Sequence, residues 1–161
     1  VAALVLGVVA CTGAAAADLK IGFVSTERVL RESAPAVRAQ KKLEREFEKR
    51  EADLKKMDRQ IRELQAILDR DAATMAEAER NNKVRELSNL SRDFQRSERS
   101  FRDDVNIRRN EELASLQERA DKIIKQIADV EKFDLILQEP VVWASPRIDI
   151  TDRVIKLLAD K

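Results

Sequence analysis

The sequence contains no histidine and no tyrosine, and its only cysteine is Cys11. After the first 17 residues it has a single glycine, Gly22. That part of the chain therefore excludes Cys/His zinc sites, nucleophilic catalysis by Ser–His or Cys–His pairs, and histidine pH switches. It also excludes glycine-rich phosphate and dinucleotide loops. Carboxylates are plentiful but spread along helices, so we predict that the protein is not an enzyme and holds no metal or other cofactor.

Aromatic residues are also scarce, at 4%, whereas charged residues reach 38% of the 161 residues. The 31 basic and 30 acidic side chains nearly cancel, leaving a net charge of +1. This length allows one domain, or one small domain with a long appendage. A nearly neutral chain argues against nucleic-acid binding, since such domains are usually strongly basic.

The chain begins with an uninterrupted apolar run over residues 1–10. A membrane-spanning helix needs about 20 such residues, so a run of this length is typical of the apolar part of a secretory signal. Ala15, Ala16 and Ala17 supply a small-residue cleavage pattern. We expect residues 1–17 to be a signal peptide whose basic start is missing, and Asp18 to begin the exported protein.

An alternative interpretation of the same segment remains open. Residues 8–11 resemble a lipoprotein signal, in which Cys11 would be lipidated and become the first residue. Otherwise Cys11 is simply an apolar residue of the leader. The chain is exported in either case, and without further cysteines it forms no disulfide in an oxidising compartment.

The exported part opens with a short β-rich segment. Residues 19–25 place Leu19, Ile21 and Phe23 on one face, which predicts a strand, and residues 26–31 predict a helical turn. Ser33-Ala34-Pro35 is typical of a helix start, with proline in the first turn.

Two long helices follow, and neither contains glycine or proline after Pro35. The first covers residues 35–70, a break falls near 69–74, and residues 74–77 form a capping-box pattern that predicts the start of a second helix reaching residue 131. At about 1.5 Å per residue, the two helices would span roughly 54 and 85 Å. Lengths of this kind predict an antiparallel helical hairpin.

Apolar residues at heptad spacing define the facing sides of the two helices. Arg50 occupies one such position in the first helix, and apolar residues are sparse between residues 92 and 112, where we expect the hairpin to bend or splay. The predicted facing residues are Leu43, Phe47, Leu54, Met57, Ile61, Leu64 and Leu68 in the first helix, and Leu87, Leu90, Phe94, Phe101, Leu113, Leu116, Ala120, Ile123, Ile127 and Val130 in the second.

The last block returns to β-rich sequence. Residues 133–137 and 141–143 predict two strands, with Trp143 in the core, and Asp149 or Thr151 is expected to cap a terminal helix. Together with residues 18–34, this block is near the lower size limit for an independent domain and leaves open strand edges. The simplest resolution is oligomerisation, with strands of neighbouring subunits closing into a barrel.

The predicted fold class is therefore α+β and mostly α. A small β-barrel body, shared between subunits, comprises residues 18–34 and 132–161, and the helical-hairpin arm comprises residues 35–131 with its tip near 69–75. The residues expected to build the oligomeric body are Ile21, Phe23, Leu135, Leu137, Val142 and Trp143.

The two ends of the exported chain resemble the Skp (OmpH-type) periplasmic chaperones. The resemblance rests on residues 20–24, on Ser33 at the start of the charged helical hairpin, and on residues 133–137 and 149–151. It implies a homotrimer with a shared barrel and three helical arms around a cavity. It further implies a periplasmic protein that holds unfolded outer-membrane proteins without ATP. The Cys11 pattern departs from the family.

Two features of the arm fit the capture of an unfolded client. Residues 80–109 carry nine basic and five acidic side chains, and residues 38–62 carry ten and six, so each segment has a local charge of +4. This charge would attract acidic clients, anionic membranes or lipopolysaccharide, although charge runs also occur as ordinary solvated helix surfaces. The basic candidates are Arg85, Arg92, Arg96, Arg99, Lys49 and Lys56.

The second feature is an apolar set with few partners. It comprises Phe47, Leu54, Met57, Phe94, Phe101 and Val105, of which Phe47, Phe94 and Phe101 are the aromatic candidates for client contact. The alternative is that these residues only join the two helices. A competing function for the whole chain is an envelope spacer or tether anchored through lipidated Cys11.

Overall fold

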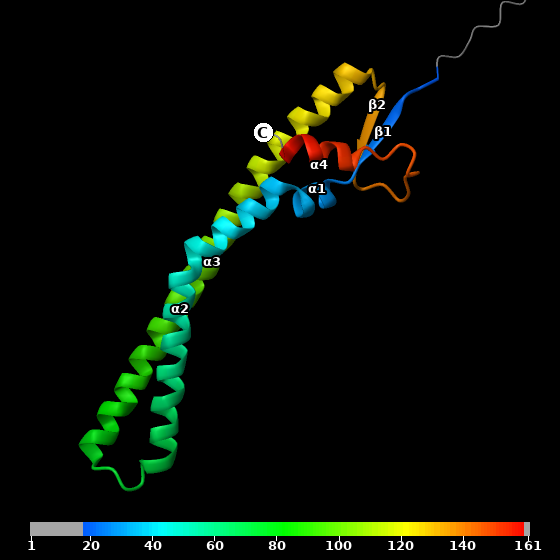
Figure 1. The fold of residues 1–161 in the computed structure, drawn as a ribbon. Helices are drawn as coiled ribbons and strands as arrows, with labels where there is room; N and C mark the ends of the chain where they lie inside the picture. Colours follow the sequence, from blue (N-terminus) through cyan, green and yellow to red (C-terminus); the bar gives the residue numbers. More distant parts are fainter. Residues whose placement is uncertain (1–17, 160–161) are drawn as a thin grey trace, which may run out of the picture.

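The computed structural model describes residues 18–159, so the predicted signal peptide and Cys11 lie outside the described residues. A small body stands at one end of a long helical arm (Figure 1). The elements in chain order are β1 (Ile21–Val24), α1 (Thr26–Glu32), α2 (Ala34–Asp71), α3 (Glu77–Glu131), β2 (Leu135–Gln138) and α4 (Thr151–Ala159). The mostly helical α+β fold predicted from the sequence is confirmed.

Serine side chains begin the first two helices. Ser25 Oγ accepts a hydrogen bond from the Arg28 amide, and Ser33 Oγ accepts one from the Ala36 amide. Each bond satisfies an amide that the first turn of a helix leaves without a partner. Pro35 lies in the first turn of α2, where its missing N–H costs nothing. The predicted helix start at Ser33 is confirmed.

The start of α3 differs from the capping-box prediction. The residue before α3 is Ala76, which makes no side-chain capping bond, whereas Thr74 Oγ1 donates to the Asp71 carbonyl. The Thr74 and Met75 amides also donate to this carbonyl, so Thr74 closes the end of α2 instead of opening α3. The tip of the arm is therefore the turn at residues 72–76.

The sheet has two parallel strands, with Ile21 opposite Leu135 and Phe23 opposite Leu137. On the other edge of β1, the Phe23 amide donates to the Ile148 carbonyl and the Ile150 amide donates to the Phe23 carbonyl. Gly22 faces the ring of Phe133, and a Cβ at this position would lie 3.1 Å from Phe133 Cε1. A side chain at this position would crowd the ring, which would have to shift by a few tenths of an ångström.

The predicted strand over residues 141–143 is wrong for the single chain. This segment pairs with no strand of the described chain, and the side chain of Trp143 is 77% exposed. Val142 is also fully exposed. The expectation that Trp143 lies in the core is therefore wrong within one chain, because no described element covers this loop.

The core lies where the last turns of α3 pass α1, α4 and β1. Because α3 is much longer than the other body elements, it supplies most of the buried side chains here. The buried apolar residues are Val24, Val29, Leu116, Ala120, Ile123, Ile124, Ile127, Val154 and Leu158. Val130 was predicted to face α2 but is 74% exposed, since α3 has passed beyond the start of α2 at that point.

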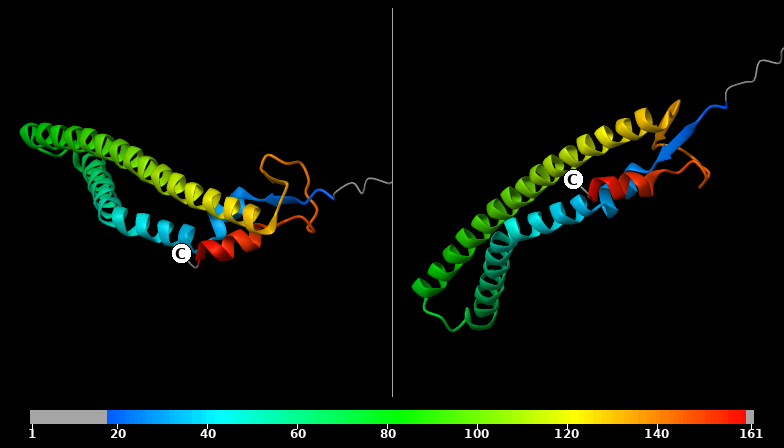
Figure 2. Two further views of the ribbon diagram at one scale, coloured as in Figure 1. Left: turned by 90° about the horizontal axis from the view of Figure 1, so that it is seen from above. Right: turned by 45° about the horizontal axis from the view of Figure 1, so that its top comes forward.

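The two arm helices differ in shape. Figure 2 shows α3 running nearly straight, whereas α2 bends partway along its length and turns toward the tip. We call residues 34–50 and 104–131 the inner arm and residues 51–103 the outer arm. The predicted bend is therefore present, but it lies in α2 and not in the sparse stretch of α3.

Candidate functional site

The inner arm is held together by ion pairs that cross from α2 to α3. The partners recur at intervals of four residues on each helix, running in opposite directions, so they form a continuous row that we call the ionic ladder. Its pairs are Lys42 Nζ–Glu112 Oε1 at 2.7 Å, Arg108 Nε–Glu46 Oε1 at 3.1 Å, and Arg50 Nη1–Asp104 Oδ2 at 2.7 Å.

The ionic ladder alternates in sign along each helix, which specifies how the helices align. Along α2 the order is basic, acidic, basic, and α3 presents the opposite order. If α3 slid by one turn, Lys42 would face Arg108 and Glu46 would face Asp104. Each slipped contact would bring like charges together, so the ladder disfavours that alignment.

Pairing within the ladder also shifts the pKa values of Glu112 and Arg108. The hydrogen bond from Lys42, and secondarily the charge of Arg108, hold the pKa of the Glu112 carboxyl below its ordinary value. The pKa of the Arg108 guanidinium is raised, mainly by its hydrogen bonds to Glu46 and Glu111. Glu112 and Arg108 are therefore both charged at neutral pH.

Arg50 ends the ladder at a position where the heptad pattern calls for an apolar side chain. Its guanidinium lies 5.8 Å from the centre of the Phe47 ring and 5.7 Å from that of Phe101. The two rings meet edge to face at 5.7 Å. Arg50 Nη2 also lies within 3.5 Å of Ser100 Oγ. A charged group therefore sits between α2 and α3 with aromatic faces on one side and Asp104 on the other.

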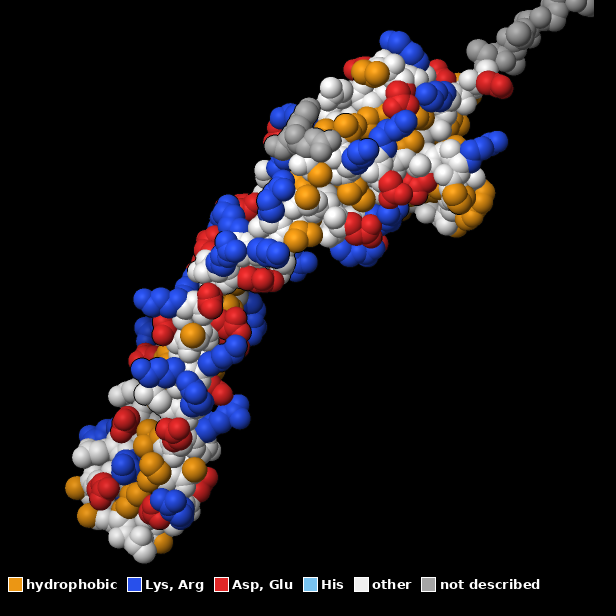
Figure 3. Space-filling view, in the orientation of Figure 1, with side chains coloured by type: hydrophobic (Ala, Val, Ile, Leu, Met, Phe, Trp, Pro, Cys, Tyr) orange, Lys and Arg blue, Asp and Glu red, His pale blue; other side chains and the backbone are white. Residues whose placement is uncertain are grey.

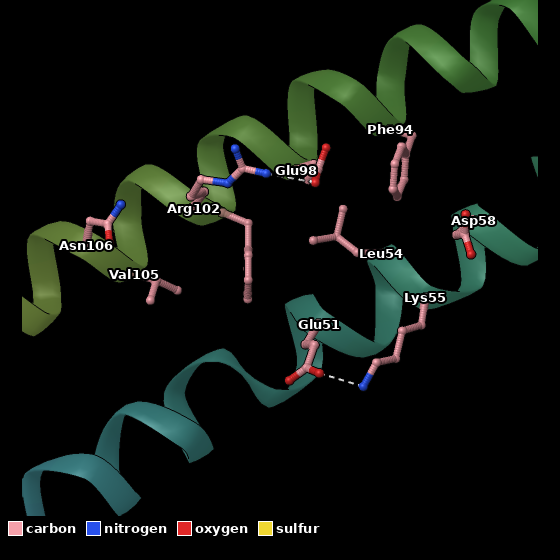
Figure 4. Close-up of a pocket in the computed structure, with 10 residues that line it drawn as sticks. Glu51, Leu54, Lys55, Asp58, Phe94, Glu98, Arg102, Val105 and Asn106 are labelled. Atoms are coloured by element: carbon pink, nitrogen blue, oxygen red, sulfur yellow. Dashed lines mark hydrogen bonds and ion pairs between the residues drawn. The ribbon is translucent and has the colours of Figure 1, made fainter.

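Next to Arg50, an open apolar space of about 460 Å³ lies between the two helices. We call this space the apolar hollow. Figure 4 shows Leu54 of α2 and Phe94 and Val105 of α3 around this space, and Phe101 lines it as well. Phe101 borders further grooves, one shared with Phe47 and one shared with Arg50. The sparse apolar stretch predicted from the sequence thus borders open space between the helices.

The charged rim of the apolar hollow is neutralised within each helix. Glu51 pairs with Lys55 at 2.5 Å, and Glu98 pairs with Arg102 at 3.0 Å. Asp58, also on the rim, pairs with Arg62 at 3.0 Å. No ion pair joins α2 to α3 anywhere between residues 51 and 103 of the described chain. The rim therefore presents no net unpaired charge to an occupant.

The outer arm buries little. Leu64 is its only buried apolar side chain among the described residues, whereas Ile61, Leu87 and Leu90 are half-buried and Val84 is 50% exposed. The space-filling view shows apolar side chains reaching the surface near the tip, while charged side chains cover the middle of the arm on the same face (Figure 3). The outer arm thus offers apolar surface that its own helices do not cover.

The basic candidates lie on the exposed surface of the arm, where they are largely free of acidic partners. Arg85 and Arg92 donate only to neutral groups of their own helix, the Asn81 carbonyl and Asn82, and Ser88 and Asn89, respectively. Arg96 pairs with Asp93 at 2.6 Å. Arg99, Lys49 and Lys56 have no hydrogen-bond or ion-pair partner within residues 18–159. The local positive charge is therefore mostly uncompensated.

The aromatic candidates do not behave alike. Phe47 is 8% exposed and joins the two helices of the inner arm. Phe94 and Phe101 are half-buried and line the apolar hollow. The four arginine candidates of α3 do not line the hollow. Among them, Arg96 borders the neighbouring groove beside Arg50 and Phe101.

The body has an uncovered apolar face. The strand register places Ile21 beside Leu135 and Phe23 beside Leu137 on one side of the sheet, opposite the side on which Val24 is buried. Leu135 is 48% exposed. These residues, with Val142 and Trp143, were expected to build the oligomeric body, and within one chain they lie outside the core.

A carboxylate connects the two halves of the body sequence. Glu139, which follows β2, accepts hydrogen bonds from Ser25 Oγ at 2.7 Å and from the Glu27 amide at 3.0 Å, at the start of α1. These bonds, with the Glu27 amide the larger cause, hold the pKa of the Glu139 carboxyl below its ordinary value. The first turn of α1 thereby gains a capping group from a segment more than a hundred residues away.

Two kinds of site are missing from residues 18–159. No helix there combines the length and apolar character needed to cross a membrane. No cluster of acidic, cysteine or histidine side chains in that range could hold a metal ion.

The ionic ladder is the main feature that sequence reasoning missed. Residues 42, 46 and 50 alternate in charge at helical spacing, as do residues 104, 108 and 112. Each half of this pattern is visible in the sequence, but matching the halves needs the alignment of the two helices. The odd polar position at Arg50 was the available signal.

Comparison with known proteins gives one consistent family. The family model described as Outer membrane protein (OmpH-like) matches residues 20–158. The chain is 28% identical over 142 residues to the chaperone protein Skp of Blochmanniella pennsylvanica, covering 87% of this chain and 86% of that protein. It is 26% identical to the chaperone protein Skp of Yersinia enterocolitica, covering 94% of this chain and 93% of that one.

A solved structure shares the fold. The crystal structure of an OmpH-like protein from Caulobacter crescentus CB15 superimposes with a TM-score of 0.72 at 21% sequence identity. The superposition covers 89% of this chain and 86% of the other. The arrangement of a small body and a long helical arm is therefore shared across low sequence identity.

Proposed function

The chain belongs to the OmpH-like family of outer-membrane proteins, and we propose that it is a periplasmic chaperone that holds unfolded outer-membrane proteins without ATP. The observation that carries the proposal is the arm, which leaves both the apolar hollow and an uncompensated basic surface exposed. A holding chaperone needs many weak contacts that each exchange quickly, and neither feature requires a catalytic group. The relatives named chaperone protein Skp support the same function.

We propose that the exported protein is a homotrimer whose subunits share a β-barrel body. The uncovered apolar side of the sheet and the exposed Trp143 support this, because apolar surface of this kind favours burial against another molecule. Residues 141–143 would supply the strand that has no partner within one chain. The subunit number is the one that the family resemblance implies.

Oligomer formation can be tested by native mass spectrometry and sedimentation. The wild type should be trimeric at micromolar concentration, and Trp143→Ser combined with Leu135→Asp should be monomeric. The matched control is Val84→Ser, which removes an exposed apolar residue from the outer arm and should leave the trimer intact. A monomeric wild type would contradict the shared body.

Holding activity can be tested by diluting a urea-unfolded outer-membrane barrel protein into buffer with the purified protein and following light scattering. Suppression near one trimer per client is expected. Because the contacts involve Arg85, Arg92, Arg96 and Arg99, suppression should weaken as salt rises. Replacing these four by glutamine should remove the salt dependence.

Two results separate the contacts involved. Salt-insensitive suppression would assign client binding to Phe94, Phe101 and the apolar residues around them. Unchanged aggregation with a folded, oligomeric preparation would reject the holding function. The control is a client that folds into a soluble globule without help, whose recovery should be the same with and without the protein.

A further inference from the structure

The arm changes character at one position. Every ion pair that crosses between α2 and α3 in the described residues lies in the inner arm, and the outermost of them is Arg50–Asp104. The apolar hollow lies beside this pair, lined by Leu54 and Phe101 of the outer arm and by Val105 of the inner arm. In the close-up, the α2 ribbon changes direction next to Glu51 (Figure 4). The ladder therefore ends where α2 bends and where the hollow lies between the helices.

Arg50 has the properties of a spacer. The positions at heptad spacing on either side of it are apolar, so a leucine at residue 50 would continue the contact between the helices. A guanidinium cannot be buried there without a large desolvation penalty. It stays 42% exposed, with Asp104 at 45%, and it takes the space beside the Phe47 and Phe101 rings. The two helices must stay apart to let water reach both charges.

We propose that Arg50 is a positioning residue that sets the clearance of the outer arm and so keeps the apolar hollow open for uncharged, apolar side chains of an unfolded client. This inference rests on the proposed holding function. Asp104 anchors the guanidinium from α3, and Phe47 and Phe101 fix its place along the arm. Beyond this point no ion pair of the described residues joins α2 to α3, and Leu64 is the one buried apolar side chain there, so the helices can separate more readily.

The chemistry of the occupant follows from the rim. Each rim charge already has a partner on its own helix, so an incoming charged group would find no unpaired counter-ion. The lining itself is apolar, formed by Leu54, Phe94, Phe101 and Val105. Aromatic and aliphatic side chains of an unfolded β-barrel strand fit this environment. The basic residues on the exposed surface would act separately, on acidic parts of the same client.

The decisive variant is Arg50→Leu, with Arg59→Leu as its matched control. Both replace an α2 arginine by leucine, but Arg59 is exposed and lies off the heptad positions. With Arg50→Leu, amide hydrogen exchange over residues 54–64 and 87–101 should slow by about tenfold, because the helices close. The dissociation constant of the Arg50→Leu variant for the urea-unfolded barrel protein should rise by about tenfold, which is the loss in affinity expected when one well-placed apolar contact is removed. The control should match the wild type in both.

A second variant guards against misfolding of the first. Asp104→Asn removes the anchor of Arg50 but leaves the guanidinium between the helices, so exchange in the outer arm should become faster, the opposite direction. Arg50→Lys keeps the charge and the pairing with Asp104 and should retain client affinity. Circular dichroism checks that each variant keeps its helical content.

The outcomes distinguish this inference from the proposed function. If Arg50→Leu leaves exchange unchanged, Arg50 does not set the clearance. If exchange slows and client affinity is unchanged, the hollow is not where client side chains bind. A wild type that binds no client rejects the holding function, whereas the exchange comparison, made without client, still decides whether Arg50 holds the helices apart.

Discussion

The inner and outer arm are built from similar residues, yet the two helices associate differently in each. The inner arm combines buried apolar residues such as Leu116 and Ile123 with the ionic ladder. In the outer arm, acidic and basic side chains pair within their own helix, and Leu64 alone is buried among the described residues. Composition alone therefore does not decide how closely two helices associate. The inner arm differs in burying apolar side chains and in pairing its charges between the helices.

This difference matches the task proposed for each part. The inner arm connects the body to the outer arm, so a fixed alignment of its two helices is an advantage. For the proposed holding function, the outer arm would have to adapt to clients of different shape, and weak association between its helices would be an advantage. Regions that move in function are commonly drawn from the less stable parts of a fold.

The largest expected contrast comes from truncating one leucine in each half. Leu116→Ala opens a cavity in the core and should lower the free energy of unfolding by about 2–5 kcal/mol. Leu90→Ala, in the half-buried outer arm, should cost roughly 1 kcal/mol or less, because solvent already reaches this site. Chemical denaturation followed by circular dichroism measures both. Equal losses would contradict the division of the arm.

A charge reversal in the ladder should have a smaller effect. Glu46→Lys places a fourth positive charge beside Lys42, Arg50 and Arg108, and should lower the thermal midpoint by a few degrees. Adding Arg108→Glu restores an opposite-charge pair at that rung and should recover part of the loss. A double-mutant cycle measures the coupling. Additive effects would mean that the rung contributes nothing as a pair.

Acidification should loosen the inner arm through Glu112. Its folded pKa is below that of the unfolded chain, so its pairing stabilises the protein above the unfolded value of about 4.3 and is lost as pH falls through the lowered folded pKa. Glu112→Gln should therefore be less stable than the wild type at pH 7, and the difference should vanish at low pH. Urea unfolding at a series of pH values measures this. A constant difference at all pH values would contradict the assignment.

The smallest effect is expected from the ion pairs within single helices of the outer arm. Glu98→Gln removes the partner of Arg102 and should leave the free energy of unfolding within about 0.5 kcal/mol of the wild type. Glu46→Gln is the matched change in the ladder and should cost more. Parallel urea titrations of the two variants compare them directly. A larger loss for Glu98→Gln would reverse the comparison.

Much of the fold was readable from short-range sequence signals. Ser33 with Pro35 predicted the start of α2, and the lack of glycine and proline from residue 36 to residue 131 predicted two long helices. The same kind of signal was wrong at Thr74, where a capping pattern competes with a turn that closes the preceding helix. It was also wrong for residues 141–143, because a strand needs a partner and none of the described elements of this chain supplies one.

The candidate site was readable only in part. The sparse apolar stretch around Phe94 and Phe101 and the basic residues of α3 were found, but nothing in the sequence paired Arg50 with Asp104. Both faces of β1 carry apolar residues, so the alternation of side chains along the strand does not predict which face is buried. The structure buries Val24 and leaves Ile21 and Phe23 on the uncovered side. That choice depends on where α3 and α4 pack.

The sequence by itself determined the long helices, the cap of α2 at Ser33 and the family to which the chain belongs, because helix propensity, capping and heptad spacing act over a few neighbouring residues. Only the tertiary structure decided which charges face each other across the arm, where α2 leaves α3, and which side of the sheet is uncovered. Arg50 and Asp104 are 54 residues apart. Whether they meet depends on the length of the turn at residues 72–76 and on the packing of every side chain between them.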